Sequence, residues 1–298
     1  RPLAPLQATP HRPRLNPAPQ RPVRSRSATG VQGHDFDFTG VTFDGGDFSG
    51  ATFSGGRVDF GGAQFSDGRV NFSGAKFSDG RVNFSGAKFS GGRVNFGEAV
   101  FSGGSVDFTR AVFSDGSVDF TRAEFSDGSV DFSVAVFSGG SVDFTRAVFS
   151  GGSIDFNDAK FYDDSVRFVR AKFSGGTVNV FGPEFYDGRV DFSGAQFSDG
   201  TVEFNRAKFY DGTVNFGGAE FSGGTVEFFE PEFSGGTVHF NGAVFSGGTV
   251  NFIWPEFSGG TVHFTRATGT APEGLVPPSG APLPSGLILP SIWYPTGS

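Results

Sequence analysis

The 298-residue chain contains no cysteine and no methionine, and only two tryptophans. The lack of cysteine excludes disulfides, thiolate metal sites and a cysteine nucleophile, and it is compatible with the cytoplasmic location that we expect. No apolar run approaches the ~20 residues of a membrane-spanning helix, and the start of the chain lacks the hydrophobic core of a signal peptide. Because residue 1 is Arg, we expect a processed chain or a fragment.

Charge is distributed unevenly along the sequence. Residues 1–33 contain six Arg and no acid, and residues 267–298 contain one charged residue, Glu273. The segment 34–266 therefore holds 17 of the 23 basic and 30 of the 31 acidic residues, a net charge of −13. A surface of this sign repels nucleic-acid phosphates on average, so a nucleic-acid ligand is not expected.

A 12-residue repeat fills most of the chain. From Ala51 to Arg266 it recurs 18 times, for example as AKFSDGRVNFSG from residue 75. The third position is Phe in every unit and the tenth is Phe in every unit but one, which has Val180. The eighth is Val except at Ile154, and the sixth is Gly except at Asp164. Such a period predicts a repeat architecture.

Within each unit, apolar residues alternate with polar ones. The pairs Ala-x-Phe and Val-x-Phe have the period of a strand with one buried face. Each pair is too short to stand alone, so it must hydrogen bond to copies above and below it. The Ser-Gly-Gly or Ser-Asp-Gly between the pairs suits a tight corner, because glycine accepts positive φ. Frequent glycine and the absence of a 3.6-residue stripe exclude helix.

One coil of the resulting solenoid could take 12 or 24 residues. Twelve residues barely enclose the ~10 Å gap between packed sheets. Twenty-four would place four Phe in each layer. Unusual residues favour 24, because they recur at that spacing: Tyr162, Tyr186 and Tyr210, and His239 and His263. We predict nine coils for these units and a rod of about 43 Å.

The sequence resembles the pentapeptide-repeat proteins, whose motif centres on a large apolar residue with a small one two positions earlier. In the stretch DFTGVTFDGGDFSGATFSGG, Phe38, Phe43, Phe48 and Phe53 follow at a spacing of five; the spacing then alternates between seven and five. The resemblance implies an all-β, right-handed, four-sided parallel β-solenoid over residues 34–266. The inserted dipeptide departs from the family pattern.

The flanking segments differ from the repeats in composition. Residues 1–33 are rich in Pro and Arg, which predicts a disordered or extended tail. Residues 267–298 are rich in Pro and Gly but end in GLILPSIWYP. That apolar stretch either covers the end of the rod as a cap or belongs to a disordered tail.

Two sets of residues are candidates for an interaction surface. Tyr162, Tyr186 and Tyr210 replace the corner Ser and would form a short exposed aromatic strip, a kind of surface that can mark binding. Asp107, Asp119 and Asp131 occupy the outward ninth position and would stack in rows of like charge. We expect Arg110, Arg122 and Arg146 to neutralise these rows, with a bound cation as the alternative.

No catalytic or cofactor chemistry is evident. His239 and His263 supply two metal ligands without a third, and no nucleophile stands with a base and an orienting group. We therefore expect a non-enzymatic scaffold without cofactor or metal that binds an unknown protein partner. The alternative is an acidic nucleic-acid mimic that inhibits a DNA-binding enzyme such as a type II topoisomerase, as the resemblance implies for some family members.

Overall fold

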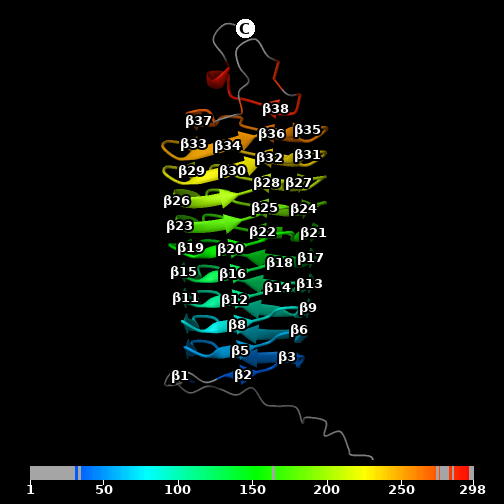
Figure 1. Cartoon of the computed structure of the whole chain (residues 1–298), viewed down its shortest axis with the longest axis vertical. Coiled ribbons are helices and arrows are strands. Elements are labelled where there is room, and N and C mark those ends of the chain that lie inside the picture. Colours follow the sequence, from blue (N-terminus) through cyan, green and yellow to red (C-terminus); the bar gives the residue numbers. More distant parts are fainter. Residues whose placement is uncertain are drawn as a thin grey trace, which may run out of the picture.

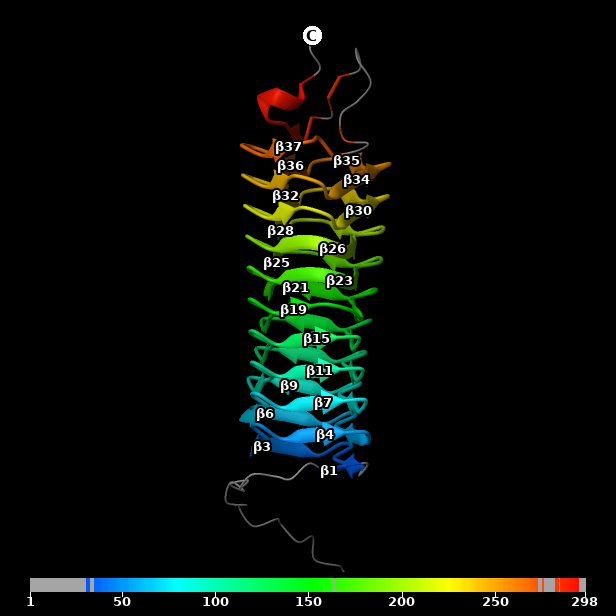
Figure 2. The same cartoon turned by 90° about the vertical axis from the view of Figure 1, so that its left-hand side faces the viewer.

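The repeats wind into an upright rod of stacked coils (Figures 1 and 2). The structure is a computed structural model that describes residues 31–32, 35–162, 165–272, 275, 282–283 and 285–294. The predicted tail 1–33 lies almost entirely outside the described residues, as does part of 267–298. Every strand pairing between named strands is parallel, which makes the fold an all-β parallel β-solenoid.

The register confirms a coil of 24 residues. Val94 is paired with Val118, and Phe77 with Phe101, each 24 residues further along the chain. Residues 12 apart lie in different sheets, because the two sheets receive alternate 12-residue units. The regular part of the rod therefore has two units and four Phe in each layer.

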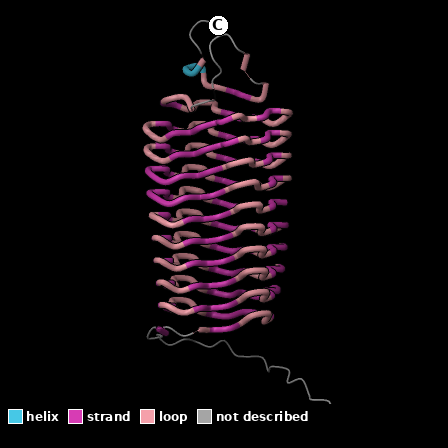
Figure 3. Tube along the Cα trace, in the orientation of Figure 1, coloured by secondary structure: helices cyan, strands magenta, loops and turns pink. Residues whose placement is uncertain are grey.

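Four columns of short strands form the sides of the rod, two in each sheet (Figure 3). Column A1 contains β1 (Val31–Gln32), β4 (Thr52–Ser54), β7 (Lys76–Ser78), β11 (Val100–Ser102), β15 (Glu124–Ser126), β19 (Val148–Phe149), the first part of β23 (Lys172–Asn179) and of β26 (Gln196–Glu203), β29 (Glu220–Phe221), β33 (Val244–Phe245) and β37 (Thr268–Gly269). Column A2 contains β2 (Phe36–Asp37), β5 (Arg57–Asp59), β8 (Arg81–Asn83), β12 (Ser105–Asp107), β16 (Ser129–Asp131), β20 (Ser153–Asp155), the second part of β23 and β26, β30 (Thr225–Phe229) and β34 (Thr249–Ile253).

The other sheet supplies the remaining two sides. Column B1 contains the first part of β3 (Thr42–Asp47) and of β6 (Gln64–Asn71), then β9 (Lys88–Ser90), β13 (Val112–Ser114), β17 (Val136–Ser138), β21 (Lys160–Tyr162), β24 (Glu184–Phe185), β27 (Lys208–Phe209), β31 (Glu232–Phe233) and β35 (Glu256–Phe257). Column B2 contains the second part of β3 and β6, β10 (Arg93–Asn95), β14 (Ser117–Asp119), β18 (Ser141–Asp143), β22 (Ser165–Arg167), β25 (Arg189–Asp191), β28 (Thr213–Asn215), β32 (Thr237–His239), β36 (Thr261–His263) and β38 (Leu287–Ile288).

The inserted dipeptide lies at the corner between the two columns of a sheet. In β3 and β6, Phe43 is aligned with Phe65, but Gly45 is aligned with Arg69, so β6 accommodates two extra residues between these points. The first coil, which lacks one insertion, is correspondingly shorter: Phe36 is paired with Val58, 22 residues on. The departure from the five-residue pattern thus widens a corner and leaves the strand columns in register.

Phenylalanine rings fill the interior in four stacked columns. Phe89 and Phe113 are typical, with ring centroids 4.7 Å apart and planes 5° from parallel. Across the coil, Phe84 meets Phe96 edge to face at 6.0 Å. Burying one such side chain contributes roughly 1.5–3 kcal/mol, so these columns dominate the stability of the rod.

One ring is missing from this interior. Val180 stands between Phe156 and Phe204 in its column and is buried, as a core residue is. A small apolar cavity lies beside it, lined by neighbouring Phe and Val side chains. The substitution therefore leaves a packing defect in an otherwise continuous stack.

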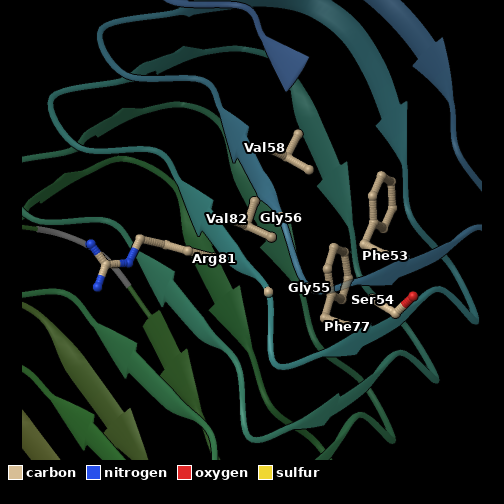
Figure 4. Close-up of a pocket in the computed structure, with 9 residues that line it drawn as sticks. Phe53, Ser54, Gly55, Gly56, Val58, Phe77, Arg81 and Val82 are labelled. Atoms are coloured by element: carbon tan, nitrogen blue, oxygen red, sulfur yellow. The ribbon is translucent and has the colours of Figure 1, made fainter. Parts of the chain in front are cut away.

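The corners explain the glycine of the sixth position. A Cβ on Gly140 would lie 2.2 Å from the carbonyl oxygen of Gly116, one coil below, so the close approach of successive coils excludes a side chain. Figure 4 shows such a corner: Phe53 and Phe77 stand one behind the other, while Arg81 points away from them. Asp164, the one departure from glycine, lies outside the described residues.

The turns between the sheets have a different requirement. In Phe84–Ala87, the amide of Ala87 donates to the carbonyl of Phe84 at 2.9 Å, and Gly86 has φ 64°. Several later coils place residues with a side chain at the same twelfth position, including Val134 at φ 60°. A β-branched residue is strained in this left-handed conformation.

The C-terminal end of the rod is covered by a later segment. Strand β38 pairs with β36. The ring of Trp293, within the 3₁₀ turn η1 (Ser291–Trp293), lies 5.3 Å from that of Phe264. Its indole N–H donates to the carbonyl of Gly269 at 2.9 Å. Trp293 thus covers the rings of Phe264 and Phe245, whereas Phe257 stays partly exposed.

Candidate functional site

The three tyrosines form a stacked strip at the corner that follows column B1. Tyr162 ends β21, and Tyr186 and Tyr210 directly follow β24 and β27. Their ring centroids are separated by 4.8 Å and then 5.1 Å. Tyr162 is 37% exposed. Because the strip begins above Ser138, with which Tyr162 is aligned, it is a local feature of three coils.

Charged side chains run beside this strip. Glu184 accepts a hydrogen bond from the hydroxyl of Tyr186 at 2.9 Å and pairs with the ammonium group of Lys160 at 3.1 Å. The bond from Lys160 lowers the pKa of Glu184, against an opposing effect of burial. The bond to Glu184 raises the pKa of Tyr186, as does burial. A charge-assisted network therefore fixes Tyr186, the middle ring of the strip, to the adjacent face.

These charges belong to a line of outward side chains along column B1. Lys160, Glu184, Lys208, Glu232 and Glu256 are aligned in successive coils. Tyrosine and charge together give the face an amphipathic character, with rings at one border and ionised groups along the middle. Such a combination suits a protein surface more than a phosphate backbone.

The aspartates do not gather on one surface. Asp107 and Asp131 are aligned in column A2, whereas Asp119 is aligned with Asp143 in column B2 of the other sheet. Each carboxylate accepts a backbone N–H two residues on; for Asp107 the donor is Thr109, at 2.8 Å. The ninth-position carboxylate therefore has a local structural use at the start of the turn.

Contrary to expectation, Arg110, Arg122 and Arg146 do not neutralise these rows; among the described residues, the arginine that reaches one of them is Arg167, which pairs with Asp143 at 3.6 Å. None of Arg110, Arg122 and Arg146 forms an ion pair with Asp107, Asp119 or Asp131; Arg122 instead pairs with Glu98 at 3.2 Å. Each of these arginines occupies the left-handed position of its turn. It directly follows the residue whose backbone N–H donates a hydrogen bond to the aspartate. Hydrogen bonding to backbone N–H groups takes the place of the predicted ion pairs.

The two histidines are aligned in successive coils of column B2, with their rings tilted by 43°. The ring centroids of His239 and His263 are 5.1 Å apart. Burial lowers the pKa of His239, with His263 and Arg189 acting in the same direction. Within the described part of the chain, no group of three His, Cys, Asp or Glu side chains is arranged to hold a metal ion. No helix among the described residues is long and apolar enough to cross a membrane.

A second aromatic group, which the sequence analysis did not identify, lies at the turn preceding column B1. Phe181, Phe229, Ile253 and Trp254 occupy positions 11 and 12 of their units; we call this group the aromatic turn edge. Trp254 is 70% exposed, and its ring centroid lies 5.5 Å from that of Phe229. The available signal was the coincidence of bulky apolar residues with Pro183, Pro231 and Pro255, which replace alanine at the next position.

Comparison with known proteins found no matching family model and no matching curated sequence. Among solved structures, the chain is similar to HetL, a pentapeptide repeat protein involved in heterocyst differentiation regulation from the cyanobacterium Nostoc sp. strain PCC 7120. The two sequences are 15% identical, and the TM-score is 0.23. The match covers 85% of this chain and 94% of HetL. It is also similar to full-length QnrB1, a plasmid-mediated fluoroquinolone resistance protein, at 15% identity, 73% and 93% coverage and a TM-score of 0.19.

Superpositions at these TM-scores carry no argument about function. The predicted parallel β-solenoid is confirmed by the coil itself, with its four strand columns and its interior Phe of the third and tenth positions.

Proposed function

We propose that the protein is a non-catalytic interaction scaffold whose partner-binding surface is centred on Tyr162, Tyr186 and Tyr210. The observation that supports this most directly is the stacked strip itself, which replaces small corner serines over three coils. Tyrosine provides a large, rigid contact area with a polar end, and it is enriched at protein interfaces for that reason. The partner is a protein with its own apolar and hydrogen-bonding groups.

The rigidity of the rod supports the same proposal. Each coil is hydrogen bonded to the next along all four columns, and the side chains at equivalent positions hold a fixed spacing. A partner therefore meets preorganised rings, and little ordering entropy is lost when it binds.

A nucleic-acid mimic is the second candidate, favoured by the net charge of −13 on residues 34–266. The arrangement of the aspartates argues against it, because the aligned row of Asp107, Asp131 and Asp155 is short. It ends at Asn83 on one side and at Asn179 on the other. Arginine and lysine also interrupt the acidic positions, for example Arg81 and Lys88. A mimic of a duplex needs a continuous row of negative charge on one face.

The test compares two full-length variants in affinity enrichment from the native cell extract. One replaces the three tyrosines by Ser, the residue of most other coils; the other replaces Asp107, Asp119 and Asp131 by Asn, which retains an acceptor for the turn. The proposal predicts that a specific partner is lost with the tyrosine variant and kept with the aspartate variant. Retention of every partner by the tyrosine variant would contradict it.

A supercoiling assay decides the alternative. Inhibition of a type II topoisomerase by the unmodified chain, weakened in the aspartate variant and unaffected in the tyrosine variant, would favour mimicry over the proposed scaffold. Absence of inhibition would leave the tyrosine surface as the supported site.

A further inference from the structure

The aromatic turn edge has an exposed ring held in a strained position. Trp254 has φ 50°, a left-handed conformation that is unfavourable for a residue with a side chain, and 70% of its surface is exposed. Phe229 lies against its ring and is aligned with Ile253 in the next coil. Phe229 and Ile253 are half-buried. An exposed tryptophan that rests on partly exposed apolar groups and is rimmed by charge is typical of a binding surface.

A shallow hollow adjoins this edge. Its walls are Trp254, Arg206, Lys208 and the carboxylates of Glu230, Glu232 and Glu256. Arg206 pairs with Glu230 at 2.9 Å, and its guanidinium carbon lies 5.7 Å from the centre of the Phe181 ring. Arg206 is thus already engaged by protein groups. The other charged groups of the hollow are the two carboxylates of Glu232 and Glu256 and the single ammonium group of Lys208. The hollow therefore has a net negative charge beside the indole.

This chemistry suits an extended segment that carries proline and arginine. Proline rings pack on exposed aromatic side chains in polyproline recognition, and arginine both pairs with carboxylates and stacks on tryptophan. The chain contains such a segment: the pattern Pro-x-Arg-Pro occurs at Pro10–Pro13 and again at Pro19–Pro22, in a region with six Arg and no acid. Charge complementarity therefore favours the protein's own N-terminal segment as the occupant.

The segment is long enough to reach the hollow. Val31 is aligned with Phe53, and the same column leads through eight further coils to Phe245, in the coil that contains Trp254. At ~4.8 Å per coil the axial distance is about 43 Å. The 18 residues from Pro13 to Val31 span about 56 Å as polyproline II. Pro10–Pro13 can therefore lie at the level of Trp254 with chain to spare.

We infer that residues 10–13 bind the aromatic turn edge of the same molecule, with a proline on Trp254 and Arg12 at the carboxylates of Glu232 and Glu256. This inference is independent of the tyrosine strip and of its partner. It gives the proline-rich segment a binding site beside the candidate interaction face. Because column B1 lies between the two aromatic groups, the bound segment would border the surface that the partner uses.

The absence of cysteine makes a direct test possible. In the full chain, Ala8→Cys introduces a unique thiol that can carry a bimane, a fluorophore whose emission is quenched by contact with a tryptophan ring. The inference predicts quenched emission that is restored by Trp254→Phe and unaffected by Trp293→Phe, since Trp293 is buried at the C-terminal end. Replacing Arg12 by Ser and raising the ionic strength should each restore part of the emission, because both weaken the ion pairs.

Dilution separates the same molecule from a second copy. Quenching within one chain does not depend on protein concentration, so the bimane emission per molecule should stay constant on dilution and on mixing with unlabelled protein. Quenching that disappears on dilution would overturn the inference in favour of binding between copies. Equal emission from the Ala8→Cys protein and its Trp254→Phe variant would also overturn it.

Discussion

The ring of Phe132 lies 4.8 Å from that of Phe108, its equivalent one coil earlier, with the two planes 5° apart. The same relationship recurs along all four columns of rings. It couples the strand register to the packing of the core, because a slip of the register by one residue would turn every ring outward.

Loss of one ring should therefore be costly. Phe132→Ala leaves a cavity in a fully buried column and should lower the free energy of unfolding by about 3–5 kcal/mol. Equilibrium denaturation followed by circular dichroism measures the change. Ser133→Ala, at the partly exposed neighbouring position, serves as the control; a loss below roughly 1 kcal/mol for Phe132→Ala would mean that the ring does not carry the packing assigned to it.

Filling the defect at Val180 should have the opposite effect. Val180→Phe restores a ring between Phe156 and Phe204, next to an apolar cavity, and should stabilise the protein by about 0.5–2 kcal/mol. Val94→Phe is the matched control, because it adds the same volume to a regular coil and should destabilise by about 1–3 kcal/mol. If both variants are destabilised alike, the cavity is not available to a ring.

Strain at the turns should be relieved by glycine. Val134 has φ 60° and is exposed, so Val134→Gly removes a left-handed β-branched residue without loss of packing. We expect a gain of about 1 kcal/mol in the free energy of unfolding. The reciprocal change Gly86→Val, in the same column of turns with open space around its Cβ position, should cost a similar amount. If the unmodified protein and both variants are equally stable, the twelfth position of the turn does not favour glycine over valine.

The pH dependence of stability should include a contribution from His239. Burial lowers its pKa in the folded protein below the usual 6.5. At a pH between the folded-state pKa and 6.5, the unfolded chain therefore binds more protons than the folded one. The contribution is present above about pH 6.5 and is lost as the pH falls through the folded-state pKa. His239→Asn, which copies Asn215 of the preceding coil, should reduce the loss of melting temperature on acidification. An unchanged pH dependence in this variant would assign the effect to other groups.

Most of the fold could be predicted from the sequence because the repeat exposes its own geometry. The Phe residues at the third and tenth positions of each unit predict a buried interior. The spacing of 24 between Tyr162 and Tyr186 predicts which residues stack. The structure bears out the coil length and the stacking of the tyrosines, of which Tyr162 is exposed and Tyr186 and Tyr210 are half-buried. A solenoid is favourable for such reasoning, since each coil contacts only its neighbours.

The surface was less predictable, for a physical reason. Asp107 could be recognised as outward-facing, but whether its carboxylate meets Arg110 or a backbone amide depends on the turn, and the turn places the amide of Thr109 closer. The exposure of Trp254 likewise depends on a left-handed backbone conformation that a tryptophan does not suggest. Pro255, which follows it, was visible as a departure from alanine but not as the mark of an aromatic edge.

The most direct test of the account is disulfide formation between residues one coil apart. Ser114 and Ser138 are aligned in β13 and β17, and neighbouring strands ~4.8 Å apart fall within the roughly 4.4–6.8 Å Cα separation that a disulfide requires. The account predicts that Ser114→Cys/Ser138→Cys oxidises readily in the native protein, whereas Ser114→Cys/Ser126→Cys, with the thiols in different sheets, stays reduced. A disulfide in the second protein and none in the first would contradict the 24-residue coil.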